Sequence, residues 1–259
     1  MNGYLKAALL QASFFLLACA PPQENCALGC PTGGSAQTLV RESYTLNNNP
    51  RTHFANWVAY TVTPASQASN RPRHWQRDPG LPAGDTLSPA DYKEANKRLS
   101  VDRGHLAPLA ALGGTTDWPT LNYLSNITPQ RTALNRGPWA RLEDQERALA
   151  NRADVAAVHS VTGPLFEQQR ETLPARADIA IPDGYWKVIF IGASPQEGKY
   201  VAFLMMQDVP ADASFCAYQV TVQEIERRTR LKIWPALSEA IARRVKGQKG
   251  GLGKEMGCG

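Results

Sequence analysis

Three long apolar runs in the second half of the chain most strongly constrain its fold. Residues 155–166, 185–194 and 199–209 are rich in β-branched and aromatic residues, which predicts buried strands. A short polar turn separates the last two, so we expect them to pair antiparallel. Two earlier runs, 38–46 and 53–63, also predict strands. Because helices do not alternate regularly with these strands, we expect one α+β domain with a central antiparallel sheet flanked by helices.

Capping signals predict where the main helices begin. Ser88 precedes Pro89, a cap followed by a first-turn proline, and this pair predicts a helix that continues through 92–99. A second helix is predicted over 138–152, where apolar residues recur on one side. Residues 221–224 form a capping box that opens a third helix. A last helix is expected before the glycine-rich tail.

The first 20 residues have the anatomy of an export signal. Lys6 is followed by an apolar run at 7–18, which is too short to span a bilayer. Two cleavage patterns stay open: an A-x-A site suits a soluble secreted protein, and a lipoprotein box would make Cys19 a lipidated membrane anchor. We therefore expect an exported protein, either secreted or held as a periplasmic or outer-membrane lipoprotein.

Removal of the signal leaves four cysteines, which implies two disulfides in an exported chain. Three pairings are allowed. Cys26 and Cys30 are close enough to favour a local loop, which would leave Cys216 to join Cys258. A zinc site would need more ligands than the local loop offers. The expected organisation is a signal at 1–20, a stapled leader at 21–37 and a domain over 38–259.

The charge and one arginine-rich loop suggest a phosphate-bearing partner. The net charge is +5 and the pI about 9.0, a mild excess that many proteins share. The loop at 70–79 is more informative, because arginine forks fit phosphate oxygens and an aromatic ring can stack on a base. A solvated basic loop is the competing interpretation. The loop's candidates are Arg71, Arg73, His74, Trp75 and Arg77.

The segment 101–112, VDRGHLAPLAAL, places charged residues directly before an apolar run. Arg103 is a second phosphate-binding candidate, and His105 titrates where a general base is useful. Taken alone, such a histidine is more often structural. Gly104 would let the backbone approach closely, and we expect the segment to form the turn into a site.

Residues further along the chain could hold a hard cation. Asn135 and Glu143 are eight residues apart, so on one helix they would be separated by about 80° and share a broad face. Arg147 follows Glu143 by four residues and could pair with it. Magnesium prefers oxygen ligands and keeps several waters, so one amide oxygen and a carboxylate acting through water would suit it. Helix capping by Asn135 and a surface ion pair of Glu143 are the alternatives.

Together these segments resemble the DNA/RNA non-specific endonucleases of the ββα-metal group. The resemblance spans nearly the whole chain after the signal, and DRGH followed by N-x3-W-x2-L-E is its most specific part. It implies a ββα-metal nuclease domain with the disulfides Cys26–Cys30 and Cys216–Cys258. It also implies cleavage of DNA and RNA, single or double stranded, to 5′-phosphorylated products, with one magnesium ion that manganese can replace.

The site residues of the family map onto this chain by motif. The resemblance implies that His105 is the general base. It also implies that Asn135 is the direct magnesium ligand and that Glu143 holds the ion through water. Arg73 and Arg103 would neutralise the phosphate as charge builds on it.

Three further residues would support these five. The resemblance makes Asn126 a supporting asparagine of the active site, and it places Asp102 and Arg147 behind the residues that act directly. Pro138 departs from expectation because it removes an amide donor close to Asn135. The family has a dimeric member, so a homodimer is a further expectation.

Two other functions compete with a non-specific nuclease. The first is a non-catalytic nucleic-acid-binding envelope lipoprotein on the same scaffold, and the presence of every expected site residue argues against it. The second is a sequence-specific nuclease, which would need a base-reading module for which no segment is spare. The chain has no Walker A spacing, no G-x-S-x-G and no H-E-x-x-H, which argues against other common chemistries.

Overall fold

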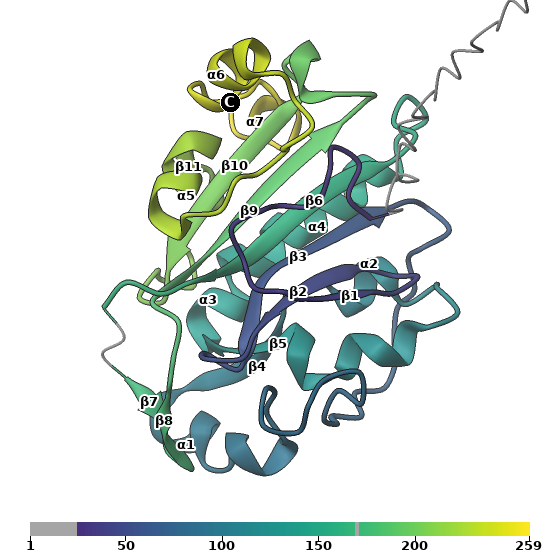
Figure 1. Ribbon diagram of the computed structural model, residues 1–259. Helices are drawn as coiled ribbons and strands as arrows, with labels where there is room; N and C mark the ends of the chain where they lie inside the picture. Colours follow the sequence, from purple (N-terminus) through teal and green to yellow (C-terminus); the bar gives the residue numbers. More distant parts are fainter. Residues whose placement is uncertain (1–24, 169–170) are drawn as a thin grey trace, which may run out of the picture.

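The computed structural model describes residues 25–168 and 171–259, so the predicted signal at 1–20, with Cys19, lies outside the described residues. In the described part, seven strands form one antiparallel sheet in the order β1-β2-β3-β6-β9-β10-β11 (Figure 1). These strands are β1 Gln37–Val40, β2 Thr45–Asn49, β3 Phe54–Val62, β6 Val158–Leu165, β9 Gly184–Ile191, β10 Tyr200–Met206 and β11 Gln219–Val220. Two small sheets pair β4 Val101–His105 with β5 Ile127–Arg131, and β7 Thr172–Leu173 with β8 Arg176–Ala180.

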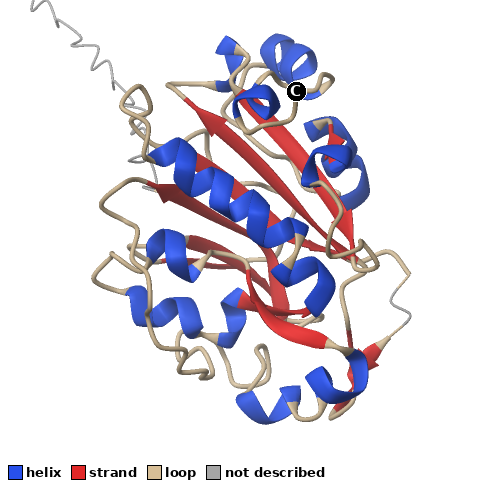
Figure 2. Cartoon of the chain, turned by 180° about the vertical axis from the view of Figure 1, so that it is seen from behind, coloured by secondary structure: helices blue, strands red, loops and turns tan. Residues whose placement is uncertain are grey.

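Helices cover both faces of the large sheet. One face carries α4, which crosses the sheet in the view from behind (Figure 2), and the other carries α5 and α6 near the C-terminus (Figure 1). No helix in the described segments is long and apolar enough to cross a membrane. The α-helices are α1 Ala95–Leu99, α2 Leu109–Leu112, α3 Thr132–Arg136, α4 Pro138–Ala150, α5 Val222–Thr229, α6 Glu239–Lys246 and α7 Leu252–Glu255. The short 3-10 helices are Pro89–Tyr92, Trp118–Asn122, Leu124–Asn126, Pro195–Glu197 and Phe215–Tyr218.

Successive apolar side chains of the central strands point to opposite faces of the sheet, so a hydrophobic core forms on each face. On β9, Tyr185 and Ile189 pack in the core that includes α4, whereas Trp186 and Val188 pack in the core that includes α5 and α6. Successive side chains of a strand point to opposite faces, so a strand buried on both faces reads as a continuous apolar run. The predicted α+β class with a central antiparallel sheet is confirmed.

Four of the five predicted strands agree with the structure. β3, β6 and β10 lie within the predicted runs, β9 begins one residue before its run, and β9 pairs antiparallel with β10 as expected. The run predicted as one strand at 38–46 is instead a hairpin, because the chain turns between Arg41 and Tyr44 and β1 pairs with β2. Thr221 caps α5 by accepting a hydrogen bond from the amide of Glu224, as the capping box predicts.

The helix predicted from Ser88 is interrupted. A 3-10 helix forms first, and the amide of Ser88 donates to the carboxylate of Asp91 at its start. Glu94 then takes the left-handed conformation with φ 62°, and α1 begins only after it. The helix expected before the glycine-rich tail is α6, and the tail itself contains the short helix α7.

The region that carries the predicted site is a β-β-α unit. DRGH, expected as a turn, is a strand: β4 pairs antiparallel with β5, with Gly104 opposite Thr128. The helix predicted from 138 is α4, and Pro138 is its first residue, where a missing amide costs no helical hydrogen bond. Gly137 lies between α3 and α4. Only glycine fits at this position, because a β-carbon there would lie 2.4 Å from the carbonyl oxygen of Ala133.

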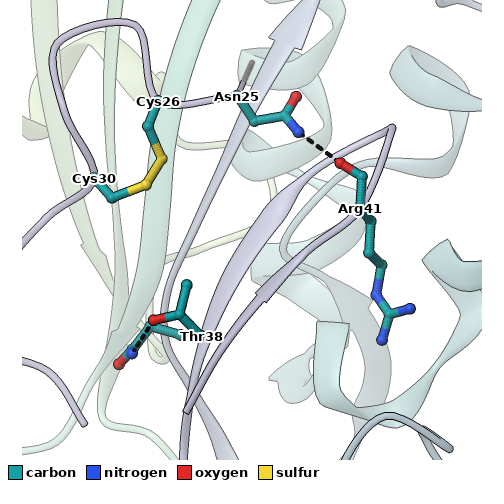
Figure 3. The surroundings of a disulfide bond; sticks show 6 residues. Asn25, Cys26, Cys30, Thr38 and Arg41 are labelled. Carbon is teal, nitrogen blue, oxygen red and sulfur yellow. Dashed lines mark hydrogen bonds between the residues drawn. A yellow bond between two sulfur atoms is a disulfide. The ribbon is translucent and has the colours of Figure 1, made fainter. Parts of the chain in front are cut away.

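Both expected disulfides are present: one closes a local loop in the leader, and the other joins the C-terminal segment to Cys216. Cys26–Cys30 closes the loop drawn in Figure 3, where the amide of Asn25 also donates to the carbonyl oxygen of Arg41 over 2.9 Å. The leader continues along the C-terminal part of the chain, because Thr32 and Lys232 exchange backbone hydrogen bonds. Cys216–Cys258 fixes the segment that follows α7.

Removing the longer disulfide is expected to destabilise the protein more than removing the shorter one. The loop-entropy relation gives about 4 kcal/mol for the sequence separation of 42 in Cys216–Cys258 and about 2 kcal/mol for the separation of 4 in Cys26–Cys30. Urea unfolding of the two paired-alanine variants measures the difference. Equal losses in the two variants would contradict the expectation.

Candidate active site

A cavity of about 740 Å³ opens beside the β4–β5 ribbon, between the loop at 73–75, α1, α3 and α4. It collects charged and polar side chains from segments that are far apart in the sequence, which is typical of a ligand site. Six of the predicted site residues line it: Arg73, Asp102, Arg103, His105, Asn135 and Glu143.

His105 lies on β4 with its ring partly exposed to this cavity. Its Nε2 is buried without a hydrogen-bond partner among the described residues, and its ring lies 5.4 Å from that of Trp75, centroid to centroid. The pKa of His105 is lowered to about 4, mainly by burial and also by the nearby positive charge of Arg73, while the hydrogen bond with the Asn122 side chain acts in the opposite direction. The imidazole is therefore neutral at neutral pH and able to accept a proton.

Arg103 is held between two aromatic rings. Its guanidinium carbon lies 5.2 Å from the ring centroid of Tyr92 and 5.7 Å from that of Trp75, and Nη2 donates to the carbonyl oxygen of Pro89 over 3.2 Å. Its Nε is buried without a partner among residues 25–168 and 171–259. An unpartnered guanidinium nitrogen at a cavity is suited to an incoming phosphate oxygen.

Only one arginine of the loop at 70–79 lines the cavity. Arg73 is exposed there, close enough to lower the pKa of His105. Arg71 instead donates to the carbonyl oxygen of Gly113 and lies over the ring of Trp118, and Arg77 donates to the backbone of Thr86. Of the loop's candidates, only the Arg73 guanidinium is placed for an incoming phosphate, whereas Arg71 and Arg77 hold the loop against its neighbours.

Asp102 fixes the orientation of the Asn135 side chain. The Asn135 amide nitrogen donates to Asp102 Oδ2 over 3.1 Å, and Arg136 donates to both carboxylate oxygens over 2.8 Å. Burial acts to raise the pKa of Asp102, but the hydrogen bonds from Arg136 and Asn135 hold it below its ordinary value. Because a carboxylate only accepts hydrogen bonds, it selects the amide orientation that leaves Asn135 Oδ1 free as a ligand.

Gly104 is required beside this amide. A β-carbon at 104 would lie 2.5 Å from Gln130 Oε1 and 3.4 Å from Asn135 Oδ1. The glycine therefore allows the side chains of Gln130 and Asn135 to approach the β4 backbone. This confirms the predicted close approach, although it occurs on a strand and not in a turn.

Asn135 and Glu143 meet at the cavity from two helices. The interpretation that placed both on one helical face fails because the chain breaks at Gly137, so Asn135 belongs to α3 and Glu143 to α4. Arg147 does not pair with Glu143: its hydrogen bond is to Asp144. The cation nearest to Glu143 is Lys187, with Nζ 3.9 Å from Oε1.

The carboxyl group of Glu143 sits beside a buried charge cluster. Burial raises its pKa to about 7, Lys187 acts to lower it, and Glu146 acts to raise it. A cation bound at the cavity would lower this pKa again, because it favours the ionised form.

Asn126 is a structural residue next to the site. Its side chain is fully buried and does not line the cavity. Its Oδ1 accepts from the amide of Ala107 over 2.8 Å, and its Nδ2 donates to the carbonyl oxygens of Ala107 and Leu121. It therefore fixes the backbone two residues after His105, which is a supporting position behind the cavity and not a place in its lining.

The cavity has the donor set of a hard-cation site. Asn135 offers an oriented amide oxygen and Glu143 a carboxylate. Among residues 25–168 and 171–259, no group of three or more His, Cys, Asp or Glu is placed to hold a metal ion. An ion here would take its remaining ligands from water and from phosphate oxygens, a pattern that magnesium accepts.

Sequence reasoning missed several residues around the cavity. Arg136, Tyr92 and Asn122 surround the predicted residues but carry no motif of their own. Lys187 did carry a signal: it is a lysine inside the apolar run YWKVIFI, where a charge must be paired.

Replacing Arg73 with alanine is expected to raise the pKa of His105 toward its ordinary value, because a positive neighbour disfavours the protonated imidazole. Burial remains, so the pKa should stay below 6.5. An NMR titration of the imidazole resonances in metal-free protein measures the shift. His159, whose pKa burial also lowers, is the internal control and should not respond. An unchanged His105 pKa would show that the charge of Arg73 does not act on the imidazole.

Comparisons with known proteins identify the family of this chain. The family model described as DNA/RNA non-specific endonuclease matches residues 21–240. A nuclease of Serratia marcescens is 55% identical over 237 residues, covering 91% of this chain and 89% of that protein. Human mitochondrial endonuclease G is 29% identical over 219 residues, covering 78% and 71%.

A solved structure supports the fold. The crystal structure of an EndoG/EndoGI complex aligns with a TM-score of 0.71 and 23% identity, covering 89% of this chain and 99% of that one. The expected family is confirmed by sequence and the expected fold by structure. The chain belongs to the DNA/RNA non-specific endonuclease family and is a nuclease, a hydrolase of phosphodiester bonds.

Proposed function

We propose that this protein is a magnesium-dependent endonuclease that cuts DNA and RNA without regard to the sugar and leaves 5′-phosphorylated ends. Nucleases of this family depend on a metal, and the choice of magnesium rests on the oxygen donors at the cavity. The observation that carries the proposal is the presence of His105, Arg103, Arg73, Asn135 and Glu143 around one cavity.

The chemistry assigned to His105 is removal of a proton from the attacking water. The water oxygen bonds to phosphorus while the bond from phosphorus to the 3′ oxygen breaks, and the departing oxygen takes a proton from solvent. A neutral imidazole with an unpartnered Nε2 suits this role. Retention of the phosphate on the 5′ side follows from which bond breaks.

We assign Arg73 and Arg103 to stabilising the negative charge that develops on the phosphate oxygens in the transition state. Arg103 has a buried nitrogen without a partner among the described residues, and Arg73 reaches the same cavity from a different loop. Fixed positive groups placed where negative charge develops lower the barrier without reorganising during the reaction.

Asn135 and Glu143 are assigned to the metal. Asn135 would bind it directly through Oδ1, and Glu143 would hold the ion's waters. A divalent cation there supplies charge neutralisation and makes its bound water more acidic. Asp102 and Arg136 keep the Asn135 oxygen turned outward for this purpose.

Contacts of this kind read the nucleic-acid backbone. Arginines and a metal recognise phosphate oxygens, which carry no sequence information. We therefore infer that single-stranded and double-stranded DNA and RNA are all substrates. A non-catalytic nucleic-acid-binding protein is the alternative, and the presence of a candidate base, two arginines and two candidate metal-binding residues around one cavity argues against it.

A plasmid and an RNA transcript incubated with the purified protein test the proposal. With magnesium both are expected to be degraded, and excess chelator is expected to stop the reaction. Mapping of labelled ends should find 5′-phosphates. Intact nucleic acid with magnesium present would refute the enzymatic proposal and favour the binding alternative.

Export is supported by the two disulfides, which form in oxidising compartments. We propose that Cys19, outside the described residues, decides between a lipid anchor and free secretion. Labelled palmitate that is incorporated into the wild type and not into Cys19→Ser would support the anchor. Unlabelled protein in the medium would support secretion.

A further inference from the structure

A buried lysine lies directly behind the cavity. Lys187 occupies the middle of β9, between Tyr185 and Ile189, and shares their face of the sheet, which α4 covers. Its side chain is fully buried. Its Nζ lies 5.1 Å from the centroid of the Trp139 ring and 5.5 Å from that of Tyr60, so aromatic rings enclose the ammonium group.

The ammonium group is held by a closed set of hydrogen bonds. Lys187 Nζ donates to Glu146 Oε2 over 2.5 Å and to the hydroxyl oxygen of Tyr60 over 2.8 Å. Glu146 also accepts from Tyr60 and from Ser160. Tyr60, Ser160 and Lys187 come from the neighbouring strands β3, β6 and β9, so Nζ is anchored to the centre of the sheet.

The same ammonium group also lies close to Glu143, a residue that lines the cavity. Glu143 and Glu146 are three residues apart on α4 and therefore lie on the same side of that helix. Lys187 Nζ lies 3.9 Å from Glu143 Oε1, and Glu143 lines the cavity. Lys187 thus connects a rigid, solvent-free cluster with a carboxylate that faces the proposed reaction.

Stability alone does not account for this cluster. Apolar residues of similar volume commonly replace a buried ion pair without loss, because burial of two charges costs more desolvation than their attraction returns. Tyr60, Glu146, Ser160 and Lys187 nevertheless form a complete polar network inside an otherwise apolar core.

We propose that Lys187 is a positioning residue that sets the place of the Glu143 carboxylate at the cavity, with Glu146, Tyr60 and Ser160 holding Lys187 in turn. The proposal rests on the role of Glu143 in the proposed nuclease function. Lys187 and its partners at the centre of the sheet do not contact the nucleic acid; they affect the reaction only by positioning Glu143.

Replacement of the whole network separates positioning from folding. In the variant Tyr60→Phe, Glu146→Leu, Ser160→Ala, Lys187→Met, no polar group of the network is left without its partner. We expect a melting temperature close to that of the wild type, but a kcat lower by about 10- to 100-fold, the usual effect of residues that orient metal ligands. KM for nucleic acid should stay unchanged. The rise in melting temperature on adding magnesium should shrink, because a weaker ligand stabilises less.

A second buried lysine–glutamate pair provides the matched control. Lys246 Nζ lies 2.7 Å from Glu226 Oε1, and Lys246 is 6% exposed, but neither residue lines the cavity. The variant Glu226→Gln, Lys246→Met should keep the wild-type kcat and the wild-type response of the melting temperature to magnesium.

A folded network variant with wild-type kcat and magnesium response would overturn the proposal. If that variant does not fold, the single variant Tyr60→Phe is the test. It should lower kcat by about 2- to 10-fold, which is the scale of one hydrogen bond. In a protein that already carries Glu143→Gln, Tyr60→Phe should not change kcat. An equal fall in kcat with and without Glu143→Gln would overturn the proposal. Failure of the wild type to cut nucleic acid would instead refute the nuclease function itself, so the two failures are distinguishable.

Discussion

His105→Ala is expected to lower kcat for plasmid cleavage by about 10²- to 10⁴-fold while the protein stays folded, because a positioned general base contributes about this much to proton transfer. The ring is partly exposed at the cavity and its Nε2 has no hydrogen-bond partner in the described part of the chain. Its removal costs one hydrogen bond with the Asn122 side chain and the contact with the Trp75 ring, and His105 and Trp75 both lie at the cavity wall. Initial rates with saturating magnesium, together with circular dichroism, measure both effects.

His74 offers a matched control for this variant. It is exposed on the neighbouring loop and does not line the cavity, so His74→Ala should cut at the wild-type rate. Added imidazole should restore part of the activity of His105→Ala, since a small base can enter the vacated space. A His105→Ala protein that cuts as fast as the His74→Ala control would refute the assignment of the base.

The second large effect is expected at the metal ligand. Asn135→Ala removes the oriented amide oxygen and should raise the magnesium concentration that gives half-maximal activity by more than about 100-fold, since changes to outer-shell groups alone cost 10- to 100-fold. The rise in melting temperature on adding magnesium should also be lost, which measures binding independently of activity. Asn151→Ala, at an exposed asparagine outside the cavity, is the control.

Asp102→Asn tests how the amide is oriented. The new carboxamide can donate as well as accept, so it no longer selects one orientation of Asn135. The magnesium requirement should then rise by about 10- to 100-fold, less than in Asn135→Ala. A larger effect at Asp102 than at Asn135 would mean that Asp102 contacts the metal or the substrate itself.

Local patterns predicted much of the site because the segment that carries it is short and nearly continuous. The strand β4 supplies Arg103 and His105, and the unit ends at Glu143 on α4. Residues that are close in sequence and fixed to regular elements keep their relative positions, so their spacing carries geometric information. The family resemblance could then assign roles to them residue by residue.

The sequence could not place side chains whose partners are distant in sequence. Arg71 and Arg77 carry the same guanidinium as Arg73, yet they bond to backbone carbonyl oxygens of neighbouring loops. Asn126 is adjacent to β5, but its amide is used up by the backbone of Ala107 and Leu121. Composition cannot distinguish a donor that is already used from one that is free.

The sequence by itself predicted the α+β class and the antiparallel pairing of the last two apolar runs, because periodicity and turn length act over short stretches of chain. The family resemblance implied the two disulfide pairs and the segment that carries the candidate site. Only the tertiary structure decided the break at Gly137, the hydrogen bond by which Asp102 orients the Asn135 amide, and the approach of Lys187 to Glu143. Each of these is a contact between side chains or backbone groups from different elements, and such contacts exist only after the sheet and helices have packed.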